Sequence, residues 1–182
     1  MGENATGAGA NVPRRRFGII SSPVGELQVV ADGDALCGLY FTPHLYPPSP
    51  ESIGPQVPVA EDPVLAPAAE ELGEYFSGER THFSVPLTTD GDAFSESVWK
   101  LLREIPFGDT CTYADLAVRL GNKHLAQRVG QAVGHNPISI IVPCHRVIGA
   151  DGSLTGFAGG LDRKRFLLSL EEPTPEAAGR LF

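Results

Sequence analysis

The chain has few of the residues that define disulfide-rich or zinc-binding proteins. Its 182 residues include three cysteines, Cys37, Cys111 and Cys144, which lie far apart and form no CxxC pair. An odd number of isolated cysteines argues against a disulfide framework and against a thiolate zinc site. We therefore expect reduced thiols and no bound metal.

Long hydrophobic runs are also missing. The longest apolar runs, such as residues 138–143, are far shorter than the roughly 20 apolar residues that a membrane-spanning helix needs. Residues 1–10 contain no basic segment followed by an apolar one, as a secretory signal would. We therefore expect no membrane partner and a cytoplasmic location. With 42% hydrophobic residues the chain can still bury a core for one large or two small domains.

Basic residues are in deficit, and the net charge of -8 disfavours a nucleic-acid partner, whose phosphates attract Lys and Arg. The deficit is confined to part of the chain. Residues 1–98 hold four basic and fourteen acidic residues, whereas residues 99–170 hold nine basic and five acidic residues, a net charge of +4. A polyanionic partner therefore belongs to the second half, and chance fluctuation is the alternative explanation.

Turn-forming residues divide the first part of the chain into short β-rich segments. Residues 17–20, 27–31 and 36–41 are apolar and are separated by SPVG and DGD. This pattern predicts an antiparallel meander. Residues 1–13 are mostly Gly, Ala and Asn with little to bury, and we expect a disordered tail there.

Prolines dominate residues 43–67, with eight in twenty-five positions, and predict a long loop without regular structure. A helix should follow, closed by Gly78 in the left-handed conformation. Its apolar residues on one side are Leu72, Tyr75 and Phe76. Residues 82–87 then resemble a last strand.

The second half has a helical pattern. Apolar residues recur at steps of three and four after Asp92, which is placed to cap the helix start, and residues 106–108 (PFG) stop it. These apolar residues are Phe94, Val98, Leu101, Leu102 and Ile105. A T-x-x-D pattern at Thr112 then begins a short helix that Gly121 ends.

A second helix over residues 123–133 follows almost at once, and the pair predicts a helix-turn-helix. Small residues leave the backbone of this helix bare beside Gln127 and Arg128. They are Ala126, Gly130, Ala132 and Gly134. Such a surface suits close approach of either DNA or another helix, and spacing alone favours neither.

Cys144 stands out among the thiols. Residues 138–142 are apolar and β-branched, so we expect a buried strand that ends at Cys144. A buried cysteine is usually an inert hydrophobic residue. His145 offers a base and Arg146 a positive field for a thiolate. Neighbours on an extended chain point to opposite faces, so Cys144 and His145 could pair only at a turn or through a water.

A base of this kind is usually oriented by a carboxylate, and two neighbouring residues at the end of the last predicted helix are candidates. They are Glu171 and Glu172, although a solvated helix end explains both equally well. Residues 149–160 contain five glycines in twelve positions and predict a flexible loop that can approach a ligand closely.

Several separate motifs, in this order and spacing, resemble those of the O6-alkylguanine-DNA alkyltransferases, also called methylated-DNA-protein-cysteine methyltransferases. The matching segments are residues 72–78 (LGEYFSG), 94–99 (FSESVW), 105–108 (IPFG), Tyr113, 134–137 (GHNP), 143–149 (PCHRVIG), 155–161 (TGFAGGL) and 167–171 (LLSLE). The resemblance implies an α+β fold. A ribonuclease-H-like antiparallel sheet domain would span residues 14–90, a helical domain with the helix-turn-helix residues 91–172, and a tail residues 173–182.

The resemblance also implies a single-turnover DNA repair enzyme. Such a protein binds double-stranded DNA through the minor groove as a monomer and flips the damaged base out of the stack. It transfers the alkyl group of O6-alkylguanine, with O4-alkylthymine as a second candidate substrate, directly to Cys144. The thioether formed is a poor leaving group, so each molecule acts once, and no cofactor is needed.

The resemblance assigns catalytic roles to five residues. Cys144 would accept the alkyl group, His145 would act as its base through a water, and Glu171 would orient His145. Asn136 would brace the turn at the active site. Tyr113 would donate a hydrogen bond to the base as its O6 becomes a leaving group.

It also assigns residues that contact DNA or the flipped guanine. These are Gln127, Arg128, Val133, Val147, Phe157 and Ala158. The carbonyls of Cys144 and Val147 would read the guanine amino group, and the amide of Ala158 would reach O6. Phe157 and Ala158 stand where some relatives have Tyr and Ser.

One departure concerns the recognition helix. Where the family usually has Arg-Ala-Val, with the arginine filling the space of the flipped base, this chain has Gln127-Arg128-Val129. Either Gln127 fills that space without a charge, or Arg128 reaches it after a shift in register. Of the two we favour Gln127.

Two other functions fit parts of the pattern. A non-catalytic lesion-binding protein similar to the alkyltransferase-like proteins would keep the fold but lack the acceptor thiol, so Cys144 argues against it. A cysteine hydrolase using Cys144 and His145 would turn over, whereas a repair protein of this kind is consumed.

Overall fold

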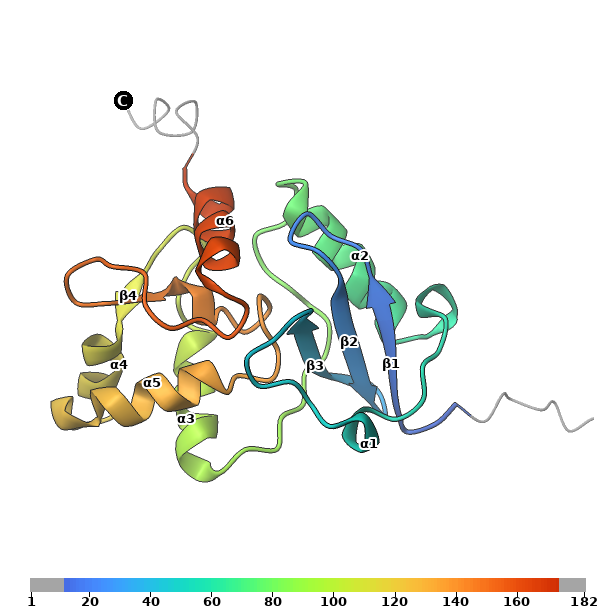
Figure 1. The fold of residues 1–182 in the computed structure, drawn as a ribbon, viewed down its shortest axis with the longest axis horizontal. Coiled ribbons are helices and arrows are strands. Elements are labelled where there is room, and N and C mark those ends of the chain that lie inside the picture. The colour runs from blue at the N-terminus through green and yellow to red at the C-terminus, as the bar shows by residue number, and fades with distance from the viewer. Residues whose placement is uncertain (1–11, 174–182) are drawn as a thin grey trace, which may run out of the picture.

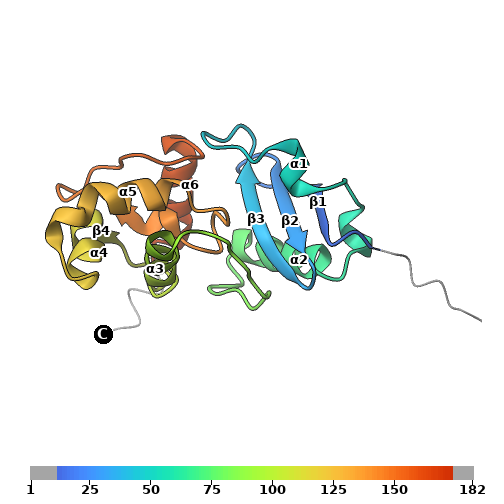
Figure 2. The same ribbon diagram turned by 90° about the horizontal axis from the view of Figure 1, so that it is seen from below.

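The computed structural model describes residues 12–173 and has an α+β fold, as predicted. An N-terminal unit built on a three-stranded sheet lies beside a mainly helical C-terminal unit (Figures 1 and 2). Strand β3 is the strand nearest the helical unit in both views. The tails predicted for residues 1–13 and 173–182 lie outside the described residues, except for residues 12, 13 and 173.

The N-terminal sheet is the predicted antiparallel meander. Strands β1 (Arg15–Ile20), β2 (Leu27–Asp32) and β3 (Ala35–Phe41) pair in chain order. Helix α2 (Leu65–Phe76) packs on the sheet and ends as predicted, with Gly78 at φ 83°, where a side chain would be strained. The side chains that α2 buries include Leu65, Ala68, Leu72 and Tyr75.

The prediction that residues 43–67 lack regular structure is wrong. They contain helix α1 (Pro50–Ile53), a 3-10 turn (Val59–Glu61) and the first residues of α2. The prolines do not exclude this, because Pro50 lies in the first turn of α1, where its fixed φ fits and its missing N–H is not needed.

The prediction of a strand at residues 82–87 is also wrong. An isolated β-bridge between Leu36 and Leu87 forms there instead. The carboxylate of Glu71 accepts the amides of Ser84 and Val85 at 3.1 to 3.2 Å, in the place of a partner strand. Pro86 has no N–H to donate. Side-chain bonding has therefore replaced strand pairing.

The helix-turn-helix forms at the predicted place. Helix α3 (Ala93–Leu102) is capped by Asp92, which accepts the Ser95 amide at 2.7 Å. A two-residue strand, β4 (Cys111–Thr112), leads into α4 (Tyr113–Arg119), which has the capping box of the T-x-x-D pattern. After a 3-10 turn (Lys123–Leu125), α5 (Ala126–Gly134) packs against both α3 and α4.

The buried strand predicted at residues 138–142 does not form. Apart from one bridge between Leu39 and Ile138, this segment is a turn in which Ile140 has φ 70°. The side chain of Asn136 holds the turn, since it accepts the Ile138 amide at 3.0 Å and donates to the Val142 carbonyl at 2.8 Å. Local side-chain bonding has again overridden β propensity.

The two units share one continuous hydrophobic core. The backbone of Leu39 in β3 joins the two units. Its amide donates a hydrogen bond to the Pro137 carbonyl at 2.8 Å, and its carbonyl accepts one from the Ser139 amide at 3.1 Å. The borders predicted at 14–90 and 91–172 stay predictions. No helix within residues 12–173 is long and apolar enough to cross a membrane.

Candidate active site at Cys144

Cys144 begins a 3-10 turn, Cys144–Arg146, rather than ending a strand. The turn follows the segment that Asn136 holds and leads into strand β5 (Val147–Ile148), which pairs with β4. All three residues of the turn are buried, and Cys144 is 5% exposed. The thiol is therefore held on a tight turn inside the protein, one of the two arrangements in which Cys144 and His145 can act together.

The histidine beside the thiol is bonded to a carboxylate. His145 Nε2 lies 2.7 Å from Glu171 Oε1, at the end of helix α6 (Leu161–Glu171). Both side chains are almost fully buried, whereas Glu172 is exposed. Of the two candidate carboxylates, the structure thus brings Glu171 to His145.

Two further side chains complete the environment of Glu171, and one of them is Arg146, which the sequence analysis had assigned to the thiolate. Arg146 donates to both carboxylate oxygens at 2.8 Å, and the Tyr75 hydroxyl donates to Oε1 at 2.8 Å. Burial alone would raise the pKa of Glu171, but the hydrogen bonds from His145 and Arg146 outweigh it and hold the pKa at about 2. Glu171 is therefore an ionised acceptor at neutral pH.

This bonding fixes the protonation of His145. Because a carboxylate accepts at Nε2, the proton of the neutral ring resides on Nε2 and the lone pair on Nδ1. Within residues 12–173, Nδ1 is buried and makes no hydrogen bond. Burial lowers the pKa of His145 in spite of Glu171, so the ring is neutral at pH 7 and is able to accept a proton.

The thiol itself is protonated at rest. Burial raises the pKa of Cys144, while the side chain of Asn136 and the charge of Lys164 act in the opposite direction. Lys164 is fully buried and donates to the Thr155 carbonyl at 2.9 Å. A nucleophilic Cys144 thus requires a base, and a buried cation stands near to stabilise the thiolate.

The segments around the turn bring further predicted residues together. The hydroxyl of Tyr113, the first residue of α4, donates to the Thr155 carbonyl at 3.2 Å. A Cβ added to Gly130 of α5 would lie 3.7 Å from the Tyr113 ring, so this glycine of the helix lies against Tyr113. Phe157 and Ala158 are half-buried in the same loop, and Val147 is buried.

The comparisons with known proteins point to one family. Residues 16–89 match the family model for the ribonuclease-like domain of 6-O-methylguanine DNA methyltransferase, and residues 93–173 match the model for its DNA binding domain. A methylated-DNA–protein-cysteine methyltransferase of Haemophilus influenzae is 45% identical over 153 residues, 83% of each chain. One of Mycobacterium tuberculosis is 44% identical over 164 residues, 90% of this chain and 96% of the relative.

This chain belongs to the methylated-DNA–protein-cysteine methyltransferase family.

Solved structures of this methyltransferase family have the same fold. The crystal structure of M. tuberculosis O6-methylguanine methyltransferase superposes with a TM-score of 0.76 at 44% identity, covering 86% of this chain and 92% of that one. The crystal structure of the M. tuberculosis protein in complex with DNA superposes with a TM-score of 0.78 at 43% identity, with the same coverage of both chains. The two-unit arrangement is therefore that of the methyltransferases.

The two candidates for the residue that fills the space of the flipped base, called here the finger residue, differ in their contacts. Gln127 and Arg128 are both exposed on α5. The Arg128 guanidinium lies 3.9 Å from the centroid of the Phe94 ring, a cation–π contact that holds it against α3. Gln127 is exposed and makes no side-chain hydrogen bond or ion pair within residues 12–173, so of the two residues Arg128 is the one held by a contact within the protein.

Val133 does not fit its predicted role as a DNA contact. It is 4% exposed and packs in the core with Val129 and Ala132, because these positions form the inner face of α5. Tyr75 and Lys164 were missed as site residues, because their partners lie far away in the sequence. Arg146 was expected to supply the positive field for the thiolate, but it donates to Glu171, and the charge that acts on Cys144 is that of Lys164.

Within residues 12–173, no group of His, Cys, Asp and Glu side chains is arranged to hold a metal ion. The buried acid, base and thiol together form a Cys-His-Glu array. Such an array can generate a thiolate and deliver it to a carbon electrophile.

Proposed function

We propose that this chain repairs DNA by direct transfer of an alkyl group from O6-alkylguanine to Sγ of Cys144. The observation that carries the proposal is the buried hydrogen bond between His145 and Glu171 beside the thiol, in a chain of the methyltransferase family. O4-alkylthymine is a second candidate substrate.

The reaction begins with proton removal. The Cys144 proton passes through a water to Nδ1 of His145, and Glu171 stabilises the imidazolium that forms. The thiolate attacks the alkyl carbon, so an S–C bond forms while the bond from that carbon to O6 breaks. The electron pair stays on the guanine, whose O6 accepts a hydrogen bond from Tyr113. The guanine takes up one proton through water while the His145 imidazolium releases one, so the net reaction moves the thiol proton to the guanine.

Asn136 supports this chemistry by holding the turn that precedes Cys144. The carbonyls of Cys144 and Val147 and the amide of Ala158 read the flipped base, and Phe157 lies in the same loop. The thioether formed is a poor leaving group, so Cys144 is used once.

We further propose that the protein acts as a cytoplasmic monomer and binds the minor groove through α4 and α5, with Gln127 filling the space of the flipped base. The clustering of basic residues in the second half agrees with DNA on this side. A non-catalytic lesion binder is less well supported, because the chain keeps Cys144 in a buried Cys-His-Glu array.

The proposal is tested by stoichiometry. We expect protein incubated with excess DNA containing O6-methylguanine to restore one guanine per molecule and then stop, and Cys144→Ala to restore none. Methylated base would be counted in digested DNA by mass spectrometry. Continued restoration beyond one guanine per protein would favour a hydrolase and refute single use of Cys144.

A further inference from the structure

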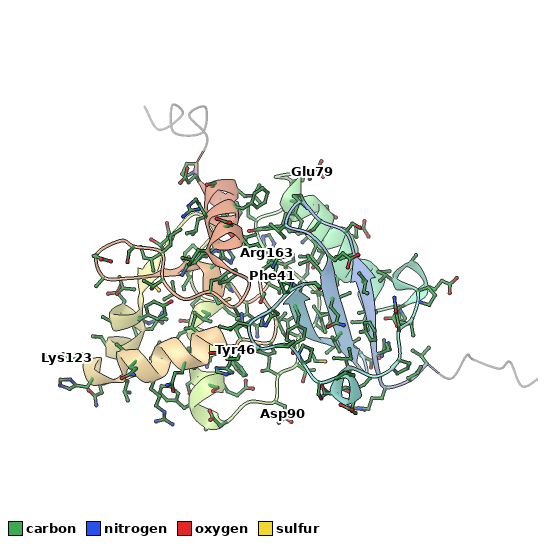
Figure 3. All side chains as sticks on the ribbon, viewed as in Figure 1. Phe41, Tyr46, Glu79, Asp90, Lys123 and Arg163 are labelled. Carbon is green, nitrogen blue, oxygen red and sulfur yellow. The ribbon has the colours of Figure 1, made fainter. Side chains whose placement is uncertain are left out.

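A segment of the N-terminal unit covers one end of the loop that precedes α6. Phe41 of β3 and Phe157 of the loop make an edge contact with centroids 5.5 Å apart. A Cβ added to Gly159 would lie 2.4 Å from the Phe41 ring, so only glycine fits there. Tyr46 stacks on His135 at 4.0 Å, next to the end of α5 (Figure 3).

Arg163, near the start of α6, ties this segment to the loop. Figure 3 shows it beside Phe41 at the junction of the two units. Its guanidinium donates to carbonyls from three separate parts of the chain. They are Val24 at 2.9 Å, Thr42 at 2.7 Å, Pro43 at 3.0 Å and Gly159 at 3.2 Å. The guanidinium also lies 5.2 Å from the centroid of Phe41.

A backbone hydrogen bond also links the segment 41–46 to Ala158, the loop residue next to Gly159. The amide of Leu45 donates to the carbonyl of Ala158 at 2.8 Å, although the Leu45 side chain is 65% exposed. Within residues 12–173, the amide of Ala158 donates no hydrogen bond, which leaves it available to a ligand. The N-terminal unit thus holds the carbonyl of Ala158 through a hydrogen bond, while the amide of Ala158 stays available to a ligand.

We propose that Arg163 is a positioning residue for lesion recognition, and that it acts by fixing residues 157–159 against the segment 41–46. This inference rests on the proposed function, in which the Ala158 amide binds O6 of the alkylated guanine. Arg163 does not touch the base. It sets the place of the Ala158 amide through Gly159 on one side and through Thr42 and Pro43, which precede Leu45, on the other.

The planar guanidinium is suited to this task because its five N–H donors are arranged in a rigid fork. A lysine at this position keeps the charge but offers a single ammonium, which cannot reach all four carbonyls. A glutamine is too short to do so. The effect should appear in the transfer step, since a small misplacement of a group that contacts the reacting atoms slows the reaction strongly.

The experiment compares Arg163→Gln with Arg165→Gln. Arg165 is a matched control, because it has the same charge on the same helix but is exposed, and within residues 12–173 it pairs only with Asp162. Binding to undamaged DNA and the rate of methyl transfer at saturating O6-methylguanine DNA are measured separately. We expect Arg163→Gln to slow transfer by about tenfold or more, with DNA affinity equal to that of the control, and Arg163→Lys to fall between.

A second pair of variants tests the backbone bond without changing Arg163. Leu45→Pro removes the amide that donates to Ala158, whereas Leu45→Ala keeps it and changes only an exposed side chain. We expect slow transfer for Leu45→Pro and the wild-type rate for Leu45→Ala. This pair also carries the test if Arg163→Gln does not fold.

The inference is overturned if, at saturating DNA, Arg163→Gln transfers methyl as fast as Arg165→Gln, or Leu45→Pro as fast as Leu45→Ala. These outcomes leave the proposed function intact, because the wild-type protein still reacts. A wild-type protein that accepts no methyl group would instead refute the proposed function itself.

Discussion

At the scale of single residues, Glu171 organises the site. It accepts hydrogen bonds from His145, Arg146 and Tyr75, which come from different parts of the chain. Its buried charge is matched by Arg146, whose Nη1 also donates to the Ile105 carbonyl at 2.6 Å. Removing one member of such a network leaves the others buried without partners, so Glu171 should matter for stability as well as for chemistry.

We predict that Glu171→Gln loses stability in a pH-dependent way. The folded pKa of Glu171, about 2, lies below its ordinary value of 4.5, so its ionised form stabilises the fold above pH 4.5, and this contribution is lost as the pH falls toward 2. The shift corresponds to roughly 3 kcal/mol. Urea unfolding should show that deficit at pH 7 and a smaller one at pH 3.

Glu172→Gln is the matched control, because Glu172 is the next residue and is exposed. Its free energy of unfolding should equal that of the wild-type protein at both pH values. An equal deficit for the two variants would contradict the role given to Glu171.

At the scale of elements, predictions from sequence succeeded where the signal is local. The three strands, the capping residue Asp92, the T-x-x-D box and the helix-turn-helix depend on periodicity and on neighbours a few residues away. The strands expected at 82–87 and 138–142 failed for the opposite reason. Glu71 and Asn136 supply side-chain hydrogen bonds there that no β-propensity pattern reveals.

The candidate site follows the same division. Cys144 and His145 are visible as neighbours in the sequence. Spacing left Glu171 and Glu172 as equal candidates, the family resemblance favoured Glu171, and the structure brings Glu171 to His145. From the sequence alone, Tyr75 is interpreted as an ordinary aromatic residue of the core and Lys164 as an ordinary charged residue of a helix. Their importance arises from packing between elements, which one sequence cannot show.

We predict that Gln127→Arg speeds methyl transfer more than Arg128→Ala slows it. An arginine at 127 would gain a charge-assisted hydrogen bond in the space of the flipped base, worth about 1.4 kcal/mol or roughly tenfold in rate. Arg128 is already engaged with Phe94, so its removal should change the rate little. Single-turnover rates of both variants provide the measurement, and the reverse ranking would assign the finger role to Arg128.

At the scale of the whole molecule, the two units form one reactive structure. The thiol, His145 and Lys164 belong to the C-terminal unit, but Tyr75 and the segment 41–46 reach the site from the N-terminal unit. The acidic excess lies in the first half, and the part matching the DNA binding domain carries the basic excess. The N-terminal unit therefore supports the site, while the C-terminal unit matches the DNA binding domain of the family.

The central claim is that Cys144 receives the alkyl group, and the mass of the protein tests it most directly. After incubation with DNA containing O6-methylguanine, the intact protein should gain the mass of one methylene, and peptide mapping should locate it on Cys144. Cys144→Ala should gain nothing. An unchanged mass with the guanine still methylated, or a methyl group mapped to Cys37 or Cys111, would contradict the account.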